Sequence, residues 1–286
     1  MSDVERHRAI AFLIVTAILW SFGGLLIKSV SWNPMAIAGT RSAIAALFML
    51  TFIRHPHFTW SPAQIGAMIV YTVTVILFVA ANKLTAAANA ILLQYTSPIY
   101  AALLGAWFLG ERTTWLDWVT IGVTMGGIAL FFLDDLAAGG HWGNGCAIAS
   151  GVSYACLVVL LRKQKEGSPL ESVLLGNALT AVVGFPFMVG ATPDLAGWVV
   201  LLILGVVQLG LPYTLYSVAI KHVTALDAIL IPAVEPILNP LWVFLVMGEV
   251  PGPWAFLGGF IVLVSVTSRS VLSALLDQRR PKKAAA

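Results

Sequence analysis

Long apolar runs follow one another along almost the whole chain, separated by short polar connections. Each run has about the 20 residues that a helix needs to cross the hydrocarbon core of a bilayer. The runs do not alternate apolar and polar residues, as the strands of a membrane barrel would, and open sheets cannot face lipid. The pattern therefore predicts an all-α membrane protein with ten transmembrane helices. Their predicted bounds are Ala9–Lys28, Pro34–Phe52, Pro62–Ala81, Ala86–Leu109, Trp115–Leu133, Gly143–Leu161, Pro169–Gly190, Leu195–Ala219, Ala225–Met247 and Pro253–Ala274.

The first run also has features of a signal peptide, because Arg6 and Arg8 precede it and the small residues Ser29-Val30-Ser31 follow it. Its apolar part is longer than the 7–15 residues of a signal-peptide core. It also has a counterpart in the second half of the chain. We therefore expect it to remain as the first transmembrane helix.

Composition and charge agree with a membrane protein. Of the 286 residues, 59% are hydrophobic and only 10% are charged, whereas soluble domains carry about 25% charged residues. Thirteen Lys and Arg residues lie in the connections on one predicted side, and only Lys28 and Lys83 lie on the other. Because basic residues gather on the cytoplasmic side, both termini are predicted to be cytoplasmic, with the protein in the cell inner membrane. The basic residues form short flanks, so nucleic acid is not a predicted partner.

The chain contains an internal repeat. A shift of 138 residues lays Lys83–Glu111 over Lys221–Glu249 without a gap, with ten identities. Five helices per unit is an odd number, so the second unit must enter the membrane from the opposite side. We therefore predict two inverted repeats, 1–136 and 137–286, the second ending in a basic cytoplasmic tail. Inverted repeats are typical of alternating-access transporters, whose substrate site lies near the membrane midplane. The identical pairs are Lys83/Lys221, Ala87/Ala225, Ala90/Ala228, Ile91/Ile229, Leu92/Leu230, Pro98/Pro236, Ile99/Ile237, Leu103/Leu241, Gly110/Gly248 and Glu111/Glu249.

At these residues the chain resembles the drug/metabolite transporter superfamily, in particular its EamA-like ten-helix exporters. The resemblance rests on Ala90–Pro98, on Leu109-Gly110-Glu111-Arg112, on Gly122 and Gly126, and on Arg41 in the second predicted helix. The second copy has Glu235-Pro236 and Gly248-Glu249. The resemblance implies a central cavity among predicted helices 1, 3, 4, 6, 8 and 9, with helices 5 and 10 on one flank. It also implies export of small metabolites, with amino acids, aromatic ones included, as the expected cargo.

Only two charges lie clearly within predicted spans, where charges are costly and usually functional. Glu235 lies about 15 Å into its helix and Arg41 about 10 Å from the outer end of its own, counting 1.5 Å per residue. These depths would allow a salt bridge, or would let the pair hold the two ends of a zwitterion. The other reading is structural, with each residue capping backbone groups freed by a nearby proline.

Prolines 98, 232, 236 and 240 are predicted to interrupt two helices, because each removes a backbone donor. Broken helices at matching positions in two halves indicate a binding site. Polar and aromatic residues near these breaks would suit an amphiphilic organic substrate, although any single tyrosine is more often a packing residue. The predicted substrate-binding residues are Glu235, Arg41, Gln94, Tyr95, Ser97, Pro98, Trp20, Tyr154, Tyr213 and Asn239.

Other classes of function lack their motifs. There is no Gly-x-x-x-x-Gly-Lys phosphate loop, and Asp134-Asp135 has no second acidic cluster with which to hold magnesium pyrophosphate. We therefore predict no enzyme activity, no cofactor and no metal, and a small-molecule substrate within a lipid bilayer. Gly122 and Gly126 are expected to pack against another helix, in a monomer or a weak dimer. The alternatives are a proton-coupled exporter of drugs or organic cations and a lipid flippase or membrane scaffold. Small multidrug pumps use a first-helix glutamate that this chain lacks.

Overall fold

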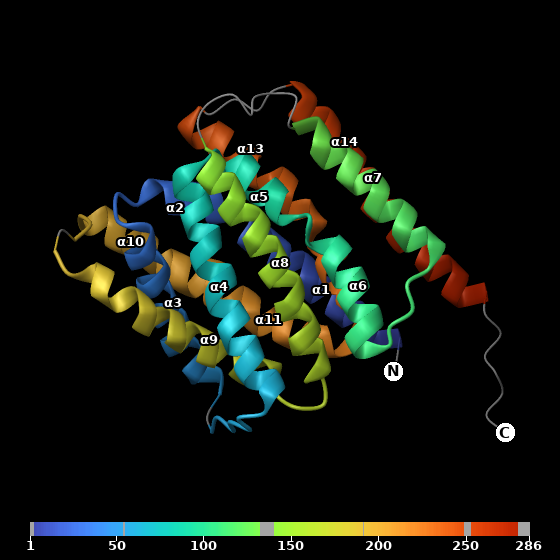
Figure 1. Ribbon diagram of the computed structural model, residues 1–286, viewed down its shortest axis with the longest axis horizontal. Helices are drawn as coiled ribbons and strands as arrows, with labels where there is room; N and C mark the ends of the chain where they lie inside the picture. The colour runs from blue at the N-terminus through green and yellow to red at the C-terminus, as the bar shows by residue number, and fades with distance from the viewer. Residues whose placement is uncertain (1–2, 54, 132–139, 191, 249–252, 280–286) are drawn as a thin grey trace.

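The computed structural model describes residues 3–53, 55–131, 140–190, 192–248 and 253–279. Within those ranges every regular element is a helix (Figure 1). In chain order the elements are α1 Asp3–Trp20, α2 Gly23–Ser29, α3 Pro34–Phe52, α4 Pro62–Leu84, α5 Ala87–Gln94, α6 Ser97–Leu109, α7 Trp115–Phe131, α8 His141–Lys163, α9 Pro169–Gly184, η1 Phe185–Met188, α10 Leu195–Ile203, η2 Leu204–Gly210, α11 Leu211–Ala219, η3 Ile220–His222, α12 Ala225–Leu230, η4 Ile231–Val234, α13 Glu235–Met247 and α14 Pro253–Arg279.

The all-helical prediction is confirmed for the described residues. Eight helical segments there are long and apolar enough to cross a membrane, and Phe256–Arg269 within α14 is a shorter apolar helix. Helix α7 has 17 residues, and its predicted end at Leu133 lies outside the described ranges. The count of ten spans and the cytoplasmic side of the termini therefore stay predictions.

Side-chain caps and glycines set the ends of several helices. Asn33 accepts the Met35 amide hydrogen at the start of α3, and Ser61 accepts that of Gln64 at the start of α4. A proline follows each cap at the first helical position, where its missing N–H leaves no bond unmade. Helices α6 and α13 both end at a left-handed glycine, Gly110 with φ 65° and Gly248 with φ 71°. These two glycines occupy equivalent positions of the repeat. Glycine is favoured at both, because it adopts a left-handed backbone conformation without strain.

Corresponding helices of the two repeats pack against each other in opposite directions. Along α7 and α14, Asp117 near the start of α7 meets Arg269, whereas Gly127 near its end lies against Gly258. Residue numbers rise in one helix as they fall in the other, so the pair is antiparallel, as Figure 1 shows. Antiparallel packing of equivalent helices is what an inverted repeat requires.

The same reversal relates α3 and α9. Gly39 lies against the backbone of Gly184, and Met49, farther along α3, lies 3.7 Å from the side-chain nitrogen of Asn177. Glycine on both sides lets these two backbones approach closely. Helices α4 and α8 also pair between repeats, since the Ser150 hydroxyl donates to the Thr74 carbonyl at 3.0 Å. The main packing surfaces of the bundle thus form between the repeats.

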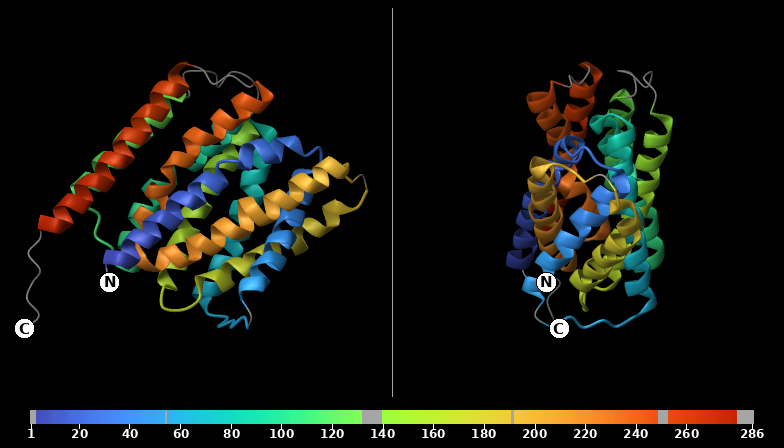
Figure 2. Two further views of the ribbon diagram at one scale, coloured as in Figure 1. Left: turned by 180° about the vertical axis from the view of Figure 1, so that it is seen from behind. Right: turned by 90° about the vertical axis from the view of Figure 1, so that its left-hand side faces the viewer.

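Helices α7 and α14 form a separate pair on one flank of the bundle (Figure 2). Gly122 and Gly126 do not mediate this packing, and their alternative role at a dimer face stays a prediction. A side chain at either position would meet nothing within 4 Å, and it is Gly127 that lies against α14. Successive residues of a helix are about 100° apart, so the face at position 127 differs from the face at position 126. A glycine spacing alone does not identify the packed face.

Four of the long helices are interrupted in their middle. The interruptions predicted from Pro98 and Pro232 are confirmed, since the helix breaks between α5 and α6 and again at η4 between α12 and α13. Two further irregularities were not predicted. One is the turn at Ser21-Phe22 between α1 and α2, and the other is the π-helical segment η2 between α10 and α11.

Candidate functional site

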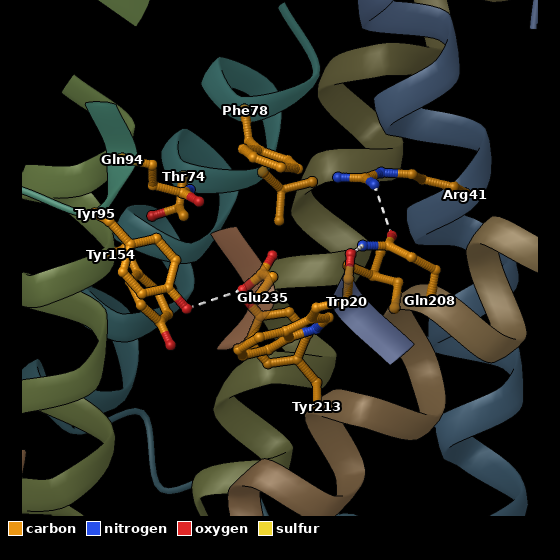
Figure 3. A pocket seen from close by; sticks show the side chains of 12 residues that line it. Trp20, Arg41, Thr74, Phe78, Gln94, Tyr95, Tyr154, Gln208, Tyr213 and Glu235 are labelled. Atoms are coloured by element: carbon orange, nitrogen blue, oxygen red, sulfur yellow. Dashed lines mark hydrogen bonds between the residues drawn. The ribbon is translucent and has the colours of Figure 1, made fainter. Parts of the chain in front are cut away.

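A cavity lies where these four irregular helices meet α3, α4 and α8. Figure 3 shows its side chains converging from helices of both repeats. Seven of the ten predicted site residues line it, and Ser97, Pro98 and Asn239 do not. The lining residues are Trp20, Arg41, Thr74, Val75, Phe78, Gln94, Tyr95, Tyr154, Gln208, Leu209, Tyr213 and Glu235.

Arg41 provides the positive charge of the cavity. It extends from α3, is 1% exposed, and donates from Nη1 to Oε1 of Gln208 at 3.0 Å. Its Nε is buried without a hydrogen-bond partner in the described structure. A guanidinium carries five N–H donors, so a neutral amide leaves much of its capacity unused. Gln208 is held in place by a second bond, from its Nε2 to the Trp20 carbonyl at 3.4 Å.

Glu235 provides the carboxyl group of the cavity. It is the first residue of α13, is 6% exposed, and accepts a hydrogen bond from the Tyr95 hydroxyl at 3.2 Å. The same hydroxyl lies 2.8 Å from the Pro232 carbonyl. Pro236 has no N–H to offer that carbonyl, which accepts the Glu235 amide hydrogen and, in addition, the Tyr95 hydroxyl. Because a hydroxyl has one proton, it cannot donate fully to both oxygens, and Glu235 remains weakly paired.

Of the two arrangements predicted for Arg41 and Glu235, the direct salt bridge does not form. No ion pair in the described part of the chain joins them, and each charge has a neutral partner instead. Both side chains nevertheless line one cavity, as Figure 3 shows. The cavity therefore presents a guanidinium and a carboxyl group at separate points.

Aromatic side chains form one wall of this cavity. The Trp20 ring lies 5.0 Å from that of Tyr213 and 6.1 Å from that of Tyr154, measured between centroids. Tyr216, behind them, lies 5.3 Å from Trp20 and within 3.4 Å of the Tyr154 hydroxyl. Edge and tilted contacts of this kind hold the rings in fixed orientations. The wall is rigid, largely apolar and carries a few hydroxyls.

Sequence reasoning missed the contribution of α4, which places Thr74, Val75 and Phe78 at the cavity. Phe78 lies four residues after Thr74 and three after Val75, which puts the three side chains on about the same side of the helix. Within a continuously apolar span, however, this pattern does not distinguish a cavity face from a packed one. Gln208 and Leu209 were also absent from the predicted set, although an amide inside a span is a usable signal.

The three predicted residues outside the cavity lie close to it along the chain. Ser97 and Pro98 begin α6 directly after the break at Tyr95-Thr96, and both are buried. Asn239 lies four residues beyond Glu235 on α13, with 0% exposure. These positions show that the proline breaks shape the cavity while the prolines themselves stay in the packing.

Other charged residues are buried in the packing near the ends of their spans. Asp117 and Arg269 are also buried, and Arg269 donates from Nε and Nη2 to Oδ1 of Asp117 at 3.0 and 2.8 Å and pairs with Asp227 through Nη1. Glu171 is buried at the start of α9. These residues lie near the ends of predicted spans. From sequence alone, charged residues at such positions are expected at the membrane–water interface. Asp134, Asp135 and Glu249, which the sequence analysis names, lie outside the described residues.

Glu111 makes structural hydrogen bonds at the end of α6. One carboxylate oxygen pairs with Arg162 Nε at 3.0 Å, and the other accepts the Ala225 amide hydrogen at 2.8 Å. Arg162 also donates to the carbonyls of Ile220 and Lys221. Glu111 thereby ties the ends of α6, α8 and η3 to the start of α12.

The model of the EamA-like transporter family matches residues 7–133 and, a second time, residues 141–269. The chain belongs to this family. The chain is therefore a multi-pass membrane transporter with two EamA units. The resemblance inferred from the repeat is confirmed.

Individual relatives agree with this assignment. An "Uncharacterized transporter" of Archaeoglobus fulgidus is 26% identical over 259 residues, covering 90% of this chain and 94% of the relative. A "Probable terminal-alkyne amino-acid exporter" of Streptantibioticus cattleyicolor is 26% identical over 194 residues, which is 63% of each chain. A solved crystal structure superposes with a TM-score of 0.75 over 95% of this chain and 99% of its own, at 19% identity. At that identity the likeness concerns the fold.

Proposed function

We propose that this transporter exports small organic metabolites from the cytoplasm across the cell inner membrane by alternating access, and that amino acids, aromatic ones included, are its substrates. The observation that carries the proposal is the pair of buried charges that face one cavity without touching. A substrate carboxylate would bind Arg41 and its ammonium group would bind Glu235. The aromatic wall at Trp20 and Tyr213 would contact the side chain.

The energetics favour a zwitterionic substrate. A buried charge without a counter-charge is costly, and removing it from water is offset only by close, well-directed partners. Arg41 and Glu235 have neutral partners only, so a ligand that carries both charges would satisfy both residues at once. A neutral ligand would satisfy neither. Charge-assisted hydrogen bonds are also stronger than those made by the amide and the phenol.

The relative described as an amino-acid exporter supports the same substrate class. The remaining candidate is a proton-coupled exporter of organic cations, which is favoured by a carboxylate, Glu235, beside the aromatic ring of Tyr95. The buried guanidinium of Arg41 in the same cavity opposes it, because a cationic ligand would be repelled. Flux that depends on a pH gradient and ignores the substrate carboxylate would favour that candidate.

The test is uptake of radiolabelled amino acids into liposomes that contain the purified protein. We expect saturable phenylalanine flux in the wild type and its loss in Glu235→Gln. Glu171→Gln is the matched control, because it neutralises another buried carboxylate, one that accepts the His57 amide hydrogen away from the cavity. Flux lost equally in both variants would point to a structural effect. A wild type that moves no amino acid would contradict the proposal and redirect the search to cations and lipids.

A further inference from the structure

Next to the cavity, three helices touch in a narrow layer. Gly24 of α2, Ala87 of α5 and Asn239 of α13 meet there: a Cβ at Gly24 would overlap Oδ1 of Asn239 and lie 3.1 Å from the Ala87 Cβ. All three residues are buried. Helix α13 and the α1–α2 junction are held together beside this layer, because the Trp242 indole donates to the Ser21 hydroxyl at 3.0 Å.

The layer adjoins the cavity along all three helices. Gly24 follows the cavity residue Trp20 by four positions, and Asn239 follows Glu235 by four. Ala87 precedes Gln94 by seven positions in α5, which is two helical turns. Spacings of four and seven keep Asn239 near the face of Glu235 and Ala87 near the face of Gln94, whereas Gly24 follows Trp20 across the Ser21-Phe22 turn. The layer therefore lies directly above the cavity, toward the Met247 end of α13, and away from the end that Glu111 and Arg162 tie together.

Asn239 has an unusual environment for an amide. Its side-chain oxygen and nitrogen are both buried, and neither has a hydrogen-bond partner in the described structure. An amide left in this state destabilises the folded protein, and an apolar residue of similar size would pack there without that cost. Buried polar groups without partners call for an explanation in terms of function, water or ligand. The amide offers both a donor and an acceptor, which suits either charged group of a zwitterion.

We propose that Gly24, Ala87 and Asn239 form the constriction that closes the cavity toward the Met247 end of α13, and that the Asn239 amide binds the polar groups of the substrate as they pass. This inference rests on the proposed export function. When the constriction opens, Asn239 gains the hydrogen bonds that it lacks in the closed state. Glycine is required at position 24 because any side chain there would meet Asn239.

The constriction can be tested without any substrate. Thr74, which lines the cavity, is replaced by cysteine after Cys146 and Cys156 are changed to alanine, and a membrane-impermeant thiol reagent is applied from each side of the liposomes. Gly24→Ala should destabilise the closed state by about 1.4 kcal/mol and so speed labelling about tenfold. The faster labelling should occur only from the side at which the Met247 end of α13 lies. Gly122→Ala is the control, because its added methyl group meets open space. Equal rates in Gly24→Ala and Gly122→Ala would overturn the constriction.

The role of the amide is tested with Asn239→Leu. Removing an unpartnered buried amide should raise the melting temperature in detergent by about 2 °C. Phenylalanine binding, measured with labelled phenylalanine at equilibrium, should stay near the wild-type value. Phenylalanine flux should fall about tenfold, because about 1.4 kcal/mol is lost only in passage. Unchanged flux, an unchanged melting temperature or an equal loss of binding and flux would each overturn this role. A wild type without phenylalanine flux would defeat the proposed function alone, since the labelling and melting experiments still decide the constriction.

Discussion

The chain buries charges in two regions and treats them in opposite ways. On the flank, Arg269 of α14 pairs with Asp117 of α7 and Asp227 of α12, so each carboxylate contacts the guanidinium. In the cavity, Arg41 and Glu235 are buried as deeply, but no ion pair joins them in the described structure. The flank residues form ion pairs with one another. Arg41 and Glu235 have only neutral hydrogen-bond partners.

This difference separates a structural network from a candidate binding site. Desolvated charges that pair with each other hold elements together, and removing one member leaves an uncompensated charge. Desolvated charges kept apart do not stabilise the fold in this way, and their retention indicates a ligand that completes them. Burial alone would have grouped the two regions together. The partners of each charge distinguish them.

The largest expected effect is on the flank. Arg269→Met would leave the buried Asp117 and the partly buried Asp227 without their cation, which costs about 3–5 kcal/mol of folding free energy. We expect a clear fall in the midpoint of thermal or denaturant unfolding. The control combines Arg269→Met with Asp117→Asn and Asp227→Asn, which removes all three charges and should recover most of the loss. A single variant as stable as the wild type would contradict the structural role of the network.

A smaller effect is expected in the cavity, and it should depend on the ligand. Arg41→Gln would remove charge-assisted hydrogen bonds to a substrate carboxylate, worth about 1.5–3 kcal/mol, and so weaken phenylalanine binding about 10- to 100-fold. Phenylethylamine has the same ring and ammonium group without the carboxylate, so its binding should not weaken. Competition against labelled phenylalanine measures both ligands. Equal weakening for the two would mean that Arg41 positions the cavity without contacting the carboxylate.

The smallest effect is expected at the aromatic wall. Tyr154→Phe removes one hydroxyl, whose contact with the Tyr216 hydroxyl is long at 3.4 Å, and keeps the ring against Trp20. The cost should stay below about 1 kcal/mol, which is less than about tenfold in phenylalanine affinity. Titration of the purified variant checks this value. A larger loss would show that this hydroxyl binds the substrate directly.

Much of the fold was accessible from sequence because membrane helices obey strong local rules. The spans follow from the length of apolar runs, and Pro98 and Pro232 mark breaks because proline has no N–H. Seven predicted residues line the cavity because tyrosines, tryptophan and charges inside spans are rare enough to notice. The same reasoning did not show that Gly127, and not Gly122 or Gly126, faces α14, since a glycine spacing does not say which face meets a neighbouring helix of the chain.

The sequence by itself determined the all-helical class, the repeat and the family, because these depend on composition, spacing and identity between the two halves. The tertiary structure alone decided which charges touch. Arg41, Glu235, Asp117 and Arg269 are all charged residues in apolar segments, and only packing across the repeats pairs two of them and separates the others. The physical reason is that a charge interacts with what lies within a few ångströms in space. Those neighbours come from helices far apart in the chain, which no local pattern brings together.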